Sequence, residues 1–329
     1  MRAAYLLSRG AADQIYGPQE RSDVAGLVDV VVPPEETGDM STLVPRLGDT
    51  KVVLSGWGAP SFDTALLDAM PRLRIVLYGA GSIRRVVTDA FWERDIAICS
   101  AWGANAVPVA EYSLSQILFC LKRGWYFARA VREARTFVPH DHVIGAYRSV
   151  VGIVSLGMIG RLVCERLQPF DLEIIAYDPF VSPDEAAGLG ITLVPLEELF
   201  QRADCVSVHT PWLPETEGLI TGALLSSMKP YAGFINSSRG AVVNEPELIS
   251  VARARPDLQF VLDVTRPEPP ATDSALYDLD NVVLTPHIAG SLGPECRRMG
   301  HYMVDELRRW VNGEPLQWSV SRAQARVMA

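Results

Sequence analysis

The chain lacks an apolar run long enough to cross a membrane. None of its 329 residues belongs to a stretch that approaches the roughly 18–20 apolar residues a bilayer requires. The apolar run at the amino terminus, 1–7, is also too short for a signal peptide. We therefore expect a soluble, cytoplasmic protein with no membrane partner.

Cysteine is scarce as well. The chain has five cysteines, and none of them forms a C-x-x-C pair. Four lie in apolar surroundings, which is typical of reduced, buried thiols in a cytosolic protein. We predict no metal site.

Positive charge is in deficit. The 30 Lys and Arg residues are outnumbered by 39 Asp and Glu residues, for a net charge of -9. This balance argues against a nucleic-acid partner, because its phosphates would be repelled. An anionic substrate would need a local cation, which Arg239 could supply.

Apolar residues make up 48% of the chain and charged residues 21%, which is ample for packed cores. The length favours two domains. Short apolar runs alternate with helix-like stretches in both halves, a pattern typical of parallel strands joined by helices. We predict an α/β fold with two doubly wound parallel-sheet domains. The expected strands are 3–7, 28–32, 51–54, 74–78 and 97–100 in the first half, and 150–154, 172–177, 191–194, 205–209, 233–236, 259–263 and 281–285 in the second.

Three further segments complete the expected organisation. A largely apolar helix is expected over 107–132, followed by a connector over 136–148. A last helix is expected from Pro294 to about Gly313. This tail has no sheet of its own, so we expect it to pack on the first domain.

A glycine-rich turn follows the apolar strand 150–154. It reads Ser155-Leu-Gly157-Met-Ile-Gly160, which is G-x-G-x-x-G with serine in the first glycine position. Gly157 would let the backbone approach a pyrophosphate, and Gly160 would let helix and strand pack closely. The helix that follows would offer its N–H groups to the phosphates. An ordinary tight turn is the alternative.

The next strand ends at Asp178, 23 residues after Ser155. A carboxylate at this place can accept the ribose hydroxyls of NAD and would repel the 2′-phosphate of NADP. We therefore predict NAD as the cofactor.

Arg239, Glu268 and His287 each come just after one of the last three expected strands. Chemistry collects at the carboxyl ends of parallel strands. Histidine exchanges protons near neutral pH, a bonded carboxylate stabilises the imidazolium, and a guanidinium pairs bidentately with a carboxylate. Taken singly, each residue could equally be an ordinary surface or structural residue. Together they suggest hydride transfer on a carboxylate-bearing substrate.

These segments resemble the D-isomer-specific 2-hydroxyacid dehydrogenase family through almost the whole chain. The resemblance is carried by the glycine turn and by Tyr177-Asp-Pro179, His209-Thr-Pro211, Ile235-Asn-Ser-Ser-Arg-Gly240, Leu262-Asp-Val264, Glu268-Pro269 and Thr285-Pro-His-Ile-Ala-Gly290.

The resemblance implies a Rossmann NAD-binding domain over 105–290 and a flavodoxin-like substrate domain over 1–104 and 291–329. It makes His287 the acid/base, Glu268 its partner and Arg239 the substrate anchor. It places the substrate carboxylate on Gly79, Ala80 and Gly81. It implies cofactor contacts at Gly157, Met158, Ile159, Gly160, Asp178, Thr210, Ser237, Ser238, Arg239, Asp263, His287 and Gly290. It also implies a homodimer.

Departures from the family pattern cluster on the substrate side. Ser82-Ile-Arg-Arg85 replaces an acidic stretch, and Ser100-Ala-Trp-Gly103 replaces Asn-x-Pro-Gly. Trp57 and Trp102 could line the pocket or pack in the core. Arg84 or Arg85 could meet a second anionic group on the substrate or begin a solvated helix. The identity of the 2-oxo acid therefore stays open.

We predict an NAD-dependent enzyme that interconverts a small 2-oxo acid and its D-2-hydroxy acid. The alternative is an NADH-sensing, corepressor-like binding module, since such relatives retain the Arg, Glu and His set. A formate-type dehydrogenase is disfavoured because that branch has glutamine where this chain has Glu268.

Overall fold

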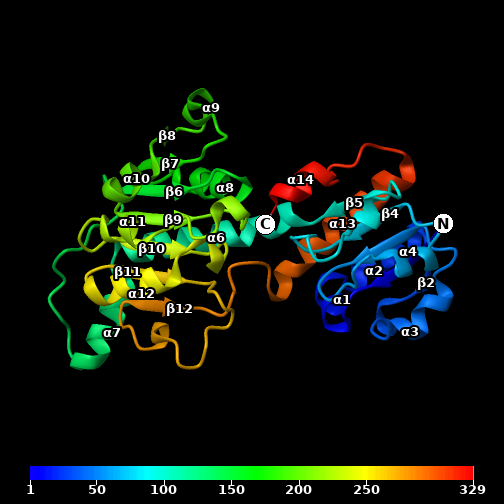
Figure 1. Ribbon diagram of the computed structural model, residues 1–329, viewed down its shortest axis with the longest axis horizontal. Coiled ribbons are helices and arrows are strands. Elements are labelled where there is room, and N and C mark those ends of the chain that lie inside the picture. Colours follow the sequence, from blue (N-terminus) through cyan, green and yellow to red (C-terminus); the bar gives the residue numbers. More distant parts are fainter. Residues whose placement is uncertain (329) are drawn as a thin grey trace. The chain divides into compact units, whose positions relative to one another are not determined.

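The computed structural model describes residues 1–328, which divide into two compact units. The first comprises residues 1–105 and 291–328, and the second comprises Ala106–Gly290. The first unit is therefore discontinuous, and in Figure 1 it holds the blue and red ends of the chain. Ser291 donates its backbone N–H to Oδ1 of Asn105 at 2.8 Å, so the two segments of this unit are joined where they meet the rest of the chain.

The first unit contains a five-stranded parallel sheet with the order β2-β1-β3-β4-β5. This is the flavodoxin-like order. Strands β3 and β4 are completely buried, since helices cover parallel sheets on both faces, whereas the edge strand β2 buries only Val32. The strands are β1 (Arg2–Leu6), β2 (Asp29–Val32), β3 (Val52–Ser55), β4 (Ile75–Tyr78) and β5 (Ala97–Ser100). The helices are α1 (Arg9–Ile15), α2 (Pro18–Leu27), α3 (Met40–Leu43), α4 (Thr64–Ala69), α5 (Asp89–Trp92), α13 (Cys296–Asn312) and α14 (Arg322–Val327), with short 3-10 turns η1 (Pro34–Glu36), η2 (Val44–Arg46) and η6 (Gly293–Glu295).

The carboxyl-terminal helix α13 packs on the first unit, as we expected. Its apolar face, which includes Met299, Met303 and Leu307, joins the same core cluster as Ile15 and Leu54. Gly300 allows this close packing, because a Cβ there would lie 2.0 Å from the Ile15 carbonyl oxygen.

The second unit contains a seven-stranded parallel sheet with the order β12-β11-β10-β9-β6-β7-β8. The strand order reverses between β6 and β9, which makes that point the topological switch of a Rossmann sheet. The strands are β6 (Val150–Val154), β7 (Glu173–Tyr177), β8 (Thr192–Leu193), β9 (Cys205–Val208), β10 (Gly233–Asn236), β11 (Gln259–Leu262) and β12 (Val282–Leu284). The helices are α6 (Trp102–Leu121), which begins in the first unit, α7 (Gly124–Ala134), α8 (Met158–Leu167), α9 (Pro183–Gly188), α10 (Leu196–Arg202), α11 (Gly222–Ser226) and α12 (Glu245–Ala254), with 3-10 turns η3 (Pro214–Thr216), η4 (Gly240–Val242) and η5 (Ala275–Tyr277).

The predicted single helix over 107–132 is wrong, because the structure has two helices there. Arg123 takes a left-handed conformation with φ 52° and separates α6 from α7. Its guanidinium stacks over Tyr126 at 4.3 Å and over Tyr231 at 4.5 Å. These contacts offset the cost of the left-handed backbone. The connector over 136–148 is confirmed as irregular chain.

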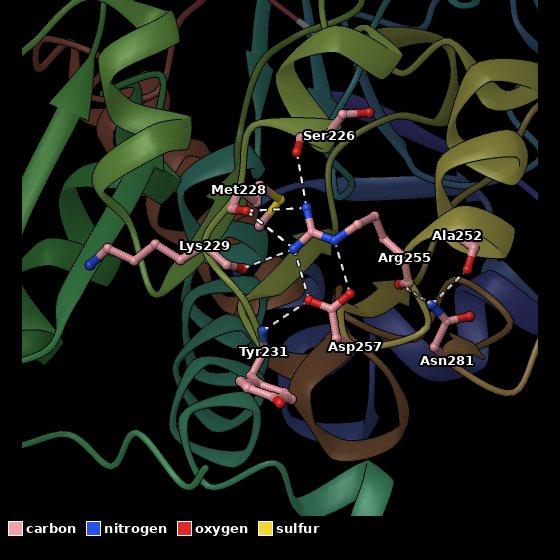
Figure 2. Close-up of polar contacts among 8 residues, drawn as sticks. All are labelled: Ser226, Met228, Lys229, Tyr231, Ala252, Arg255, Asp257 and Asn281. Atoms are coloured by element: carbon pink, nitrogen blue, oxygen red, sulfur yellow. Dashed lines mark hydrogen bonds and ion pairs between the residues drawn. The ribbon is translucent and has the colours of Figure 1, made fainter.

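Arg255 closes the amino-terminal edge of the second sheet, opposite the strand ends that carry the predicted site. It forms a double ion pair with Asp257 next to β11 and donates to backbone carbonyls at the end of α11 and in the segment that follows it (Figure 2). These acceptors are the carbonyls of Ser226, Met228 and Lys229. The loops at this edge are therefore held by hydrogen bonds that do not involve the residues of the predicted site at the other edge.

The five cysteines are all free and buried, as we expected. The core of the second unit includes Cys120, Cys164 and Cys205, while Cys99 and Cys296 belong to the first. Burial raises the pKa of the Cys164 thiol to about 12. That thiol is therefore protonated at neutral pH and behaves as a small apolar side chain.

Candidate active site

His287 and Glu268 form an ion pair at the carboxyl edge of the second sheet. Glu268 follows β11 and His287 follows β12, and His287 Nδ1 lies 2.5 Å from Glu268 Oε1. Because Nδ1 faces the carboxylate, Nε2 is the ring nitrogen that can exchange a proton with a bound molecule. The two side chains are 48% and 42% exposed, so a ligand can reach them.

Asp263 organises the loop that carries His287. This carboxylate is buried and accepts from Thr285 Oγ1 at 2.6 Å, from the Ile288 N–H at 2.8 Å and from the Ala289 N–H at 2.9 Å. Its own carbonyl accepts from the His287 N–H at 3.0 Å. These bonds hold His287 at φ 56°, a conformation that costs an ordinary residue about 1–2 kcal/mol. The histidine is therefore presented by a loop that a buried carboxylate stabilises.

Arg239 lies where β10 ends and the turn η4 begins. Its Nη1 donates to the Ser238 carbonyl at 2.7 Å, and the side chain is half-buried. A Cβ on the next residue, Gly240, would lie 2.1 Å from the backbone carbon of Thr265. Glycine at 240 therefore lets the loop that leads to Glu268 pack directly against the turn that follows Arg239.

The glycine turn after β6 is built around Ser155. This residue has φ 77°, which favours glycine, and its hydroxyl lies 2.9 Å from the Thr210 hydroxyl at the end of β9. A Cβ at Gly160 would lie 2.1 Å from the Ser155 carbonyl oxygen, so Gly160 permits the close approach of helix and turn. Serine is tolerated in the first glycine position because the hydroxyl pair offsets part of the backbone strain.

The start of α8 fits a dinucleotide diphosphate. Gly157 precedes the helix without a capping side chain, and a Cβ there would meet nothing within 4 Å. Met158 and Ile159 are the first two residues of the helix. Their backbone N–H groups lack partners from a preceding turn of helix, and the positive end of the helix dipole lies there.

Asp178 follows β7 and accepts two backbone hydrogen bonds. Its Oδ2 accepts from the Leu156 N–H at 2.7 Å, and its Oδ1 accepts from the Phe180 N–H at 2.8 Å. Each oxygen keeps a further lone pair for a ribose hydroxyl. Phe180 is 92% exposed and lies two residues after Asp178. We did not single out this aromatic side chain from the sequence, although its position after the strand was a usable signal.

Thr210, Ser237 and Ser238 lie at the carboxyl ends of β9 and β10 and are buried. The Ser237 hydroxyl lies 3.1 Å from that of Ser113 on α6. The Ser238 hydroxyl donates to Asn236 Oδ1 at 2.9 Å. Their hydroxyl groups are therefore engaged with the protein. Gly290 is the last residue of the second unit and is half-buried.

Gly79, Ala80 and Gly81 follow β4 in the first unit. Gly79 lies against Tyr16, whose hydroxyl would be 3.0 Å from a Cβ at that position. The Ser100 hydroxyl donates to the carbonyls of Ala80 and Gly81 at 2.9 and 2.5 Å. These two hydrogen bonds fix the backbone conformation of the loop 79–81.

Trp57 and Trp102 pack as core residues of the first unit. Both are half-buried and lie against apolar clusters of that unit. Trp102 meets Trp318 edge to face, with ring centroids 5.7 Å apart. Arg84 and Arg85 are exposed.

Within residues 1–328, no group of three or more His, Cys, Asp or Glu side chains is placed to hold a metal ion. In the same residues no helix is long and apolar enough to span a membrane.

A family model described as "D-isomer specific 2-hydroxyacid dehydrogenase, NAD binding domain" matches residues 114–289, which is more than half of the chain. The chain belongs to this family. The predictions of this family and of NAD as the cofactor are therefore confirmed.

Named dehydrogenases of this family are similar to the chain. The D-3-phosphoglycerate dehydrogenase of Mycobacterium tuberculosis is 35% identical over 259 residues, which cover 78% of this chain and 48% of the relative. The chain thus spans about half the length of such relatives. The (S)-sulfolactate dehydrogenase of Chromohalobacter salexigens is 36% identical over 250 residues, covering 75% of this chain and 80% of the relative.

A solved structure supports the fold. The NAD-complexed D-isomer specific 2-hydroxyacid dehydrogenase from Lactobacillus delbrueckii ssp. bulgaricus matches with a TM-score of 0.81 at 21% identity, covering 97% of this chain and 99% of that one. The predicted α/β fold with two parallel sheets is therefore confirmed.

The structure adds one residue to the network around the His287 loop that we did not predict. Tyr112 on α6 places its hydroxyl 2.9 Å from Thr285 Oγ1, which in turn donates to Asp263. Burial raises the pKa of Tyr112. No sequence spacing could reveal this contact, because α6 precedes β12 by some 170 residues and meets it only in the folded family domain.

Proposed function

We propose that the chain catalyses the NAD(H)-dependent interconversion of a small 2-oxo acid and its D-2-hydroxy acid. The observation that carries the proposal is the ion pair between His287 and Glu268, which lies at the carboxyl edge of a sheet that belongs to the family's NAD-binding domain. In such a sheet, the substrate and the nicotinamide bind at the carboxyl edge, and reduction of a carbonyl there needs a proton donor. A histidine paired with a carboxylate can supply that proton.

In the reductive direction, bound NADH would supply a hydride to the carbonyl carbon of the substrate. His287, protonated and held by Glu268, would donate its Nε2 proton to the carbonyl oxygen, so that hydride and proton together give the hydroxy acid. Arg239 would pair with the substrate carboxylate. We also propose that the backbone N–H groups of Gly79, Ala80 and Gly81 bind a carboxylate.

Oxidation of NADH against a panel of 2-oxo acids tests this proposal. The panel contains glyoxylate, hydroxypyruvate, pyruvate and phenylpyruvate. It also contains phosphohydroxypyruvate and sulfopyruvate, since two relatives are named for phosphoglycerate and sulfolactate. We expect turnover of at least one acid and a loss of about 100-fold or more in His287→Ala. Tight NADH binding without turnover of any acid would contradict the enzyme and favour a binding module.

We also propose a homodimer. Helix α7 has an apolar face but no buried residue in the single chain, and Phe119 and Phe137 beside it are 40% and 93% exposed. A second copy of the chain would cover these side chains. Light scattering at micromolar concentration should give twice the mass of one chain, and a monomeric mass would contradict this.

A further inference from the structure

Trp212, Glu217 and Arg266 form a connected cluster beside the loop that carries Glu268. Arg266 Nη1 lies 2.6 Å from Glu217 Oε1. The Trp212 indole N–H donates to the other carboxylate oxygen, Oε2, at 3.1 Å. The Arg266 guanidinium stacks over the Trp212 ring at 4.9 Å from its centroid. Each of the three side chains therefore contacts both of the others.

This cluster joins two loops of the carboxyl edge. Trp212 and Glu217 belong to the segment after β9, whereas Arg266 lies two residues before Glu268 in the segment after β11. The indole N–H and the guanidinium hold the pKa of Glu217 below its ordinary value, so this carboxylate is charged at neutral pH. A charge-assisted bond and a stacking contact thus act on the same side chain, Arg266.

The backbone around Arg266 is held as well. Its N–H donates to Glu245 Oε2 at 3.1 Å, and the preceding residue, Thr265, packs against Gly240. Thr265 Oγ1 donates to the Pro267 carbonyl at 2.8 Å. The chain is therefore anchored up to the residue directly before Glu268.

The contact between Glu268 and His287 contributes too little free energy to fix the position of the two side chains by itself. Both side chains are nearly half exposed, and ion pairs of that exposure contribute only about 0–1 kcal/mol. A contact of 2.5 Å between two such groups requires that the loops bring them together. Catalytic groups have to be held within a fraction of an ångström by their surroundings to act efficiently.

We propose that Trp212, Glu217 and Arg266 are positioning residues that hold Glu268 against His287. The proposal rests on the proposed function for its kinetic consequence, but its structural consequence is measurable on the protein without substrate. The cluster would act through Glu268. Its removal should therefore change the behaviour of His287 only while residue 268 can still bond to the histidine.

The first test is the NMR titration of the His287 ring in Arg266→Ala and in Glu217→Gln, with His287→Ala used for assignment. Loss of positioning weakens the bond to Glu268, so the titration midpoint should fall in both variants, as in Glu268→Gln. A field effect alone would raise the midpoint when Arg266 is removed and lower it when Glu217 is neutralised. Midpoints that move in opposite directions, or not at all, would overturn the proposal.

The ion pair of Arg202 and Glu173 serves as a matched control. Arg202 Nη2 lies 2.7 Å from Oε1 of Glu173 at the start of β7, and the two side chains are 40% and 48% exposed. Arg202→Ala and Glu173→Gln should leave the His287 titration unchanged. If Arg266→Ala folds poorly, Arg266→Gln replaces it, because it also removes the charge and the two effects again predict opposite shifts.

The second test is a double-mutant cycle on kcat for the acid that the panel identifies. We expect Arg266→Ala to lower kcat about fivefold in the parent protein and to change it little in the Glu268→Gln background. Equal losses in both backgrounds would show an ordinary structural role and overturn the proposal. If no acid is turned over, the proposed function fails, while the NMR titration still decides the positioning role.

Discussion

His209 shows how burial removes a histidine from the chemistry of the site. It follows β9 directly, its Nε2 lies 3.0 Å from the Ser207 hydroxyl, and within the described residues its Nδ1 has no hydrogen-bond partner. Burial lowers its pKa from 6.5 to about 3. His209 is therefore neutral at physiological pH. It is buried, whereas His287 is exposed, although both follow a strand of the same sheet.

The depressed pKa of His209 predicts a pH-dependent stability. The unfolded chain takes up a proton on this residue below pH 6.5 while the folded chain does not, so stability falls with pH from about 6.5 down to about 3. Between pH 7 and pH 5 the free energy of unfolding should fall by about 2 kcal/mol more in the parent protein than in His209→Gln. Urea unfolding at both pH values measures this, and equal losses would show that His209 is not buried as a neutral ring.

At the level of single elements, the start of helix α8 shows two glycines with different roles, Gly157 just before the helix and Gly160 in its first turn. Gly157 has φ -65° and open space around it, so alanine fits there in the protein alone. Gly160 lies against the Ser155 carbonyl, so alanine would push the helix from the turn. We expect Gly157→Ala to keep the melting temperature and to weaken NADH binding about tenfold or more.

Gly160→Ala should instead lower the melting temperature by several degrees, because a Cβ cannot lie 2.1 Å from a carbonyl oxygen. Thermal unfolding and NADH fluorescence on the two variants separate these effects. Unchanged NADH affinity in Gly157→Ala would contradict a diphosphate at this helix terminus.

Elements also show where sequence reasoning succeeded. Strands such as β5, β6 and β10 begin and end at the predicted residues, because continuous apolar runs bounded by polar residues mark buried parallel strands. The break between α6 and α7 was missed. The left-handed Arg123 that makes this break is stabilised by Tyr231, a residue over 100 positions later that no local pattern connects to it.

At the scale of the whole molecule, the carboxyl-terminal tail completes the first unit. Residues 317–320 run antiparallel beside β5, with a bridge from Ser319 to Cys99. The carboxylate of Glu306 on α13 is fully buried and accepts from the Gln317 and Trp318 N–H groups and from Arg309. A buried carboxylate therefore holds the tail against the sheet.

Glu306→Gln should destabilise the first unit by about 1–3 kcal/mol, because it removes charge-assisted bonds in a buried place. The second unit has a separate core, so its unfolding should not change. Hydrogen exchange resolved along the chain measures both. Equal loss of protection in the two units would contradict independent cores.

Local sequence patterns were enough to predict the strands, the glycine turn, and the position of Arg239, Glu268 and His287 after three strands. These features depend on local patterns of apolar, glycine and polar residues, and they sufficed for the family that the comparison then confirmed. The roles of these three residues stay predictions.

The contacts that hold the candidate site in place became visible only in the folded chain. Three sets of contacts join different loops: the bonds that Asp263 accepts from the His287 loop, the contact of Thr265 with Gly240, and the contacts of Arg266 with Glu217 and Trp212. The residues that they join are 22 to 54 positions apart. No periodicity encodes such contacts, because side chains from different loops meet only when the parallel strands bring their carboxyl ends to one edge.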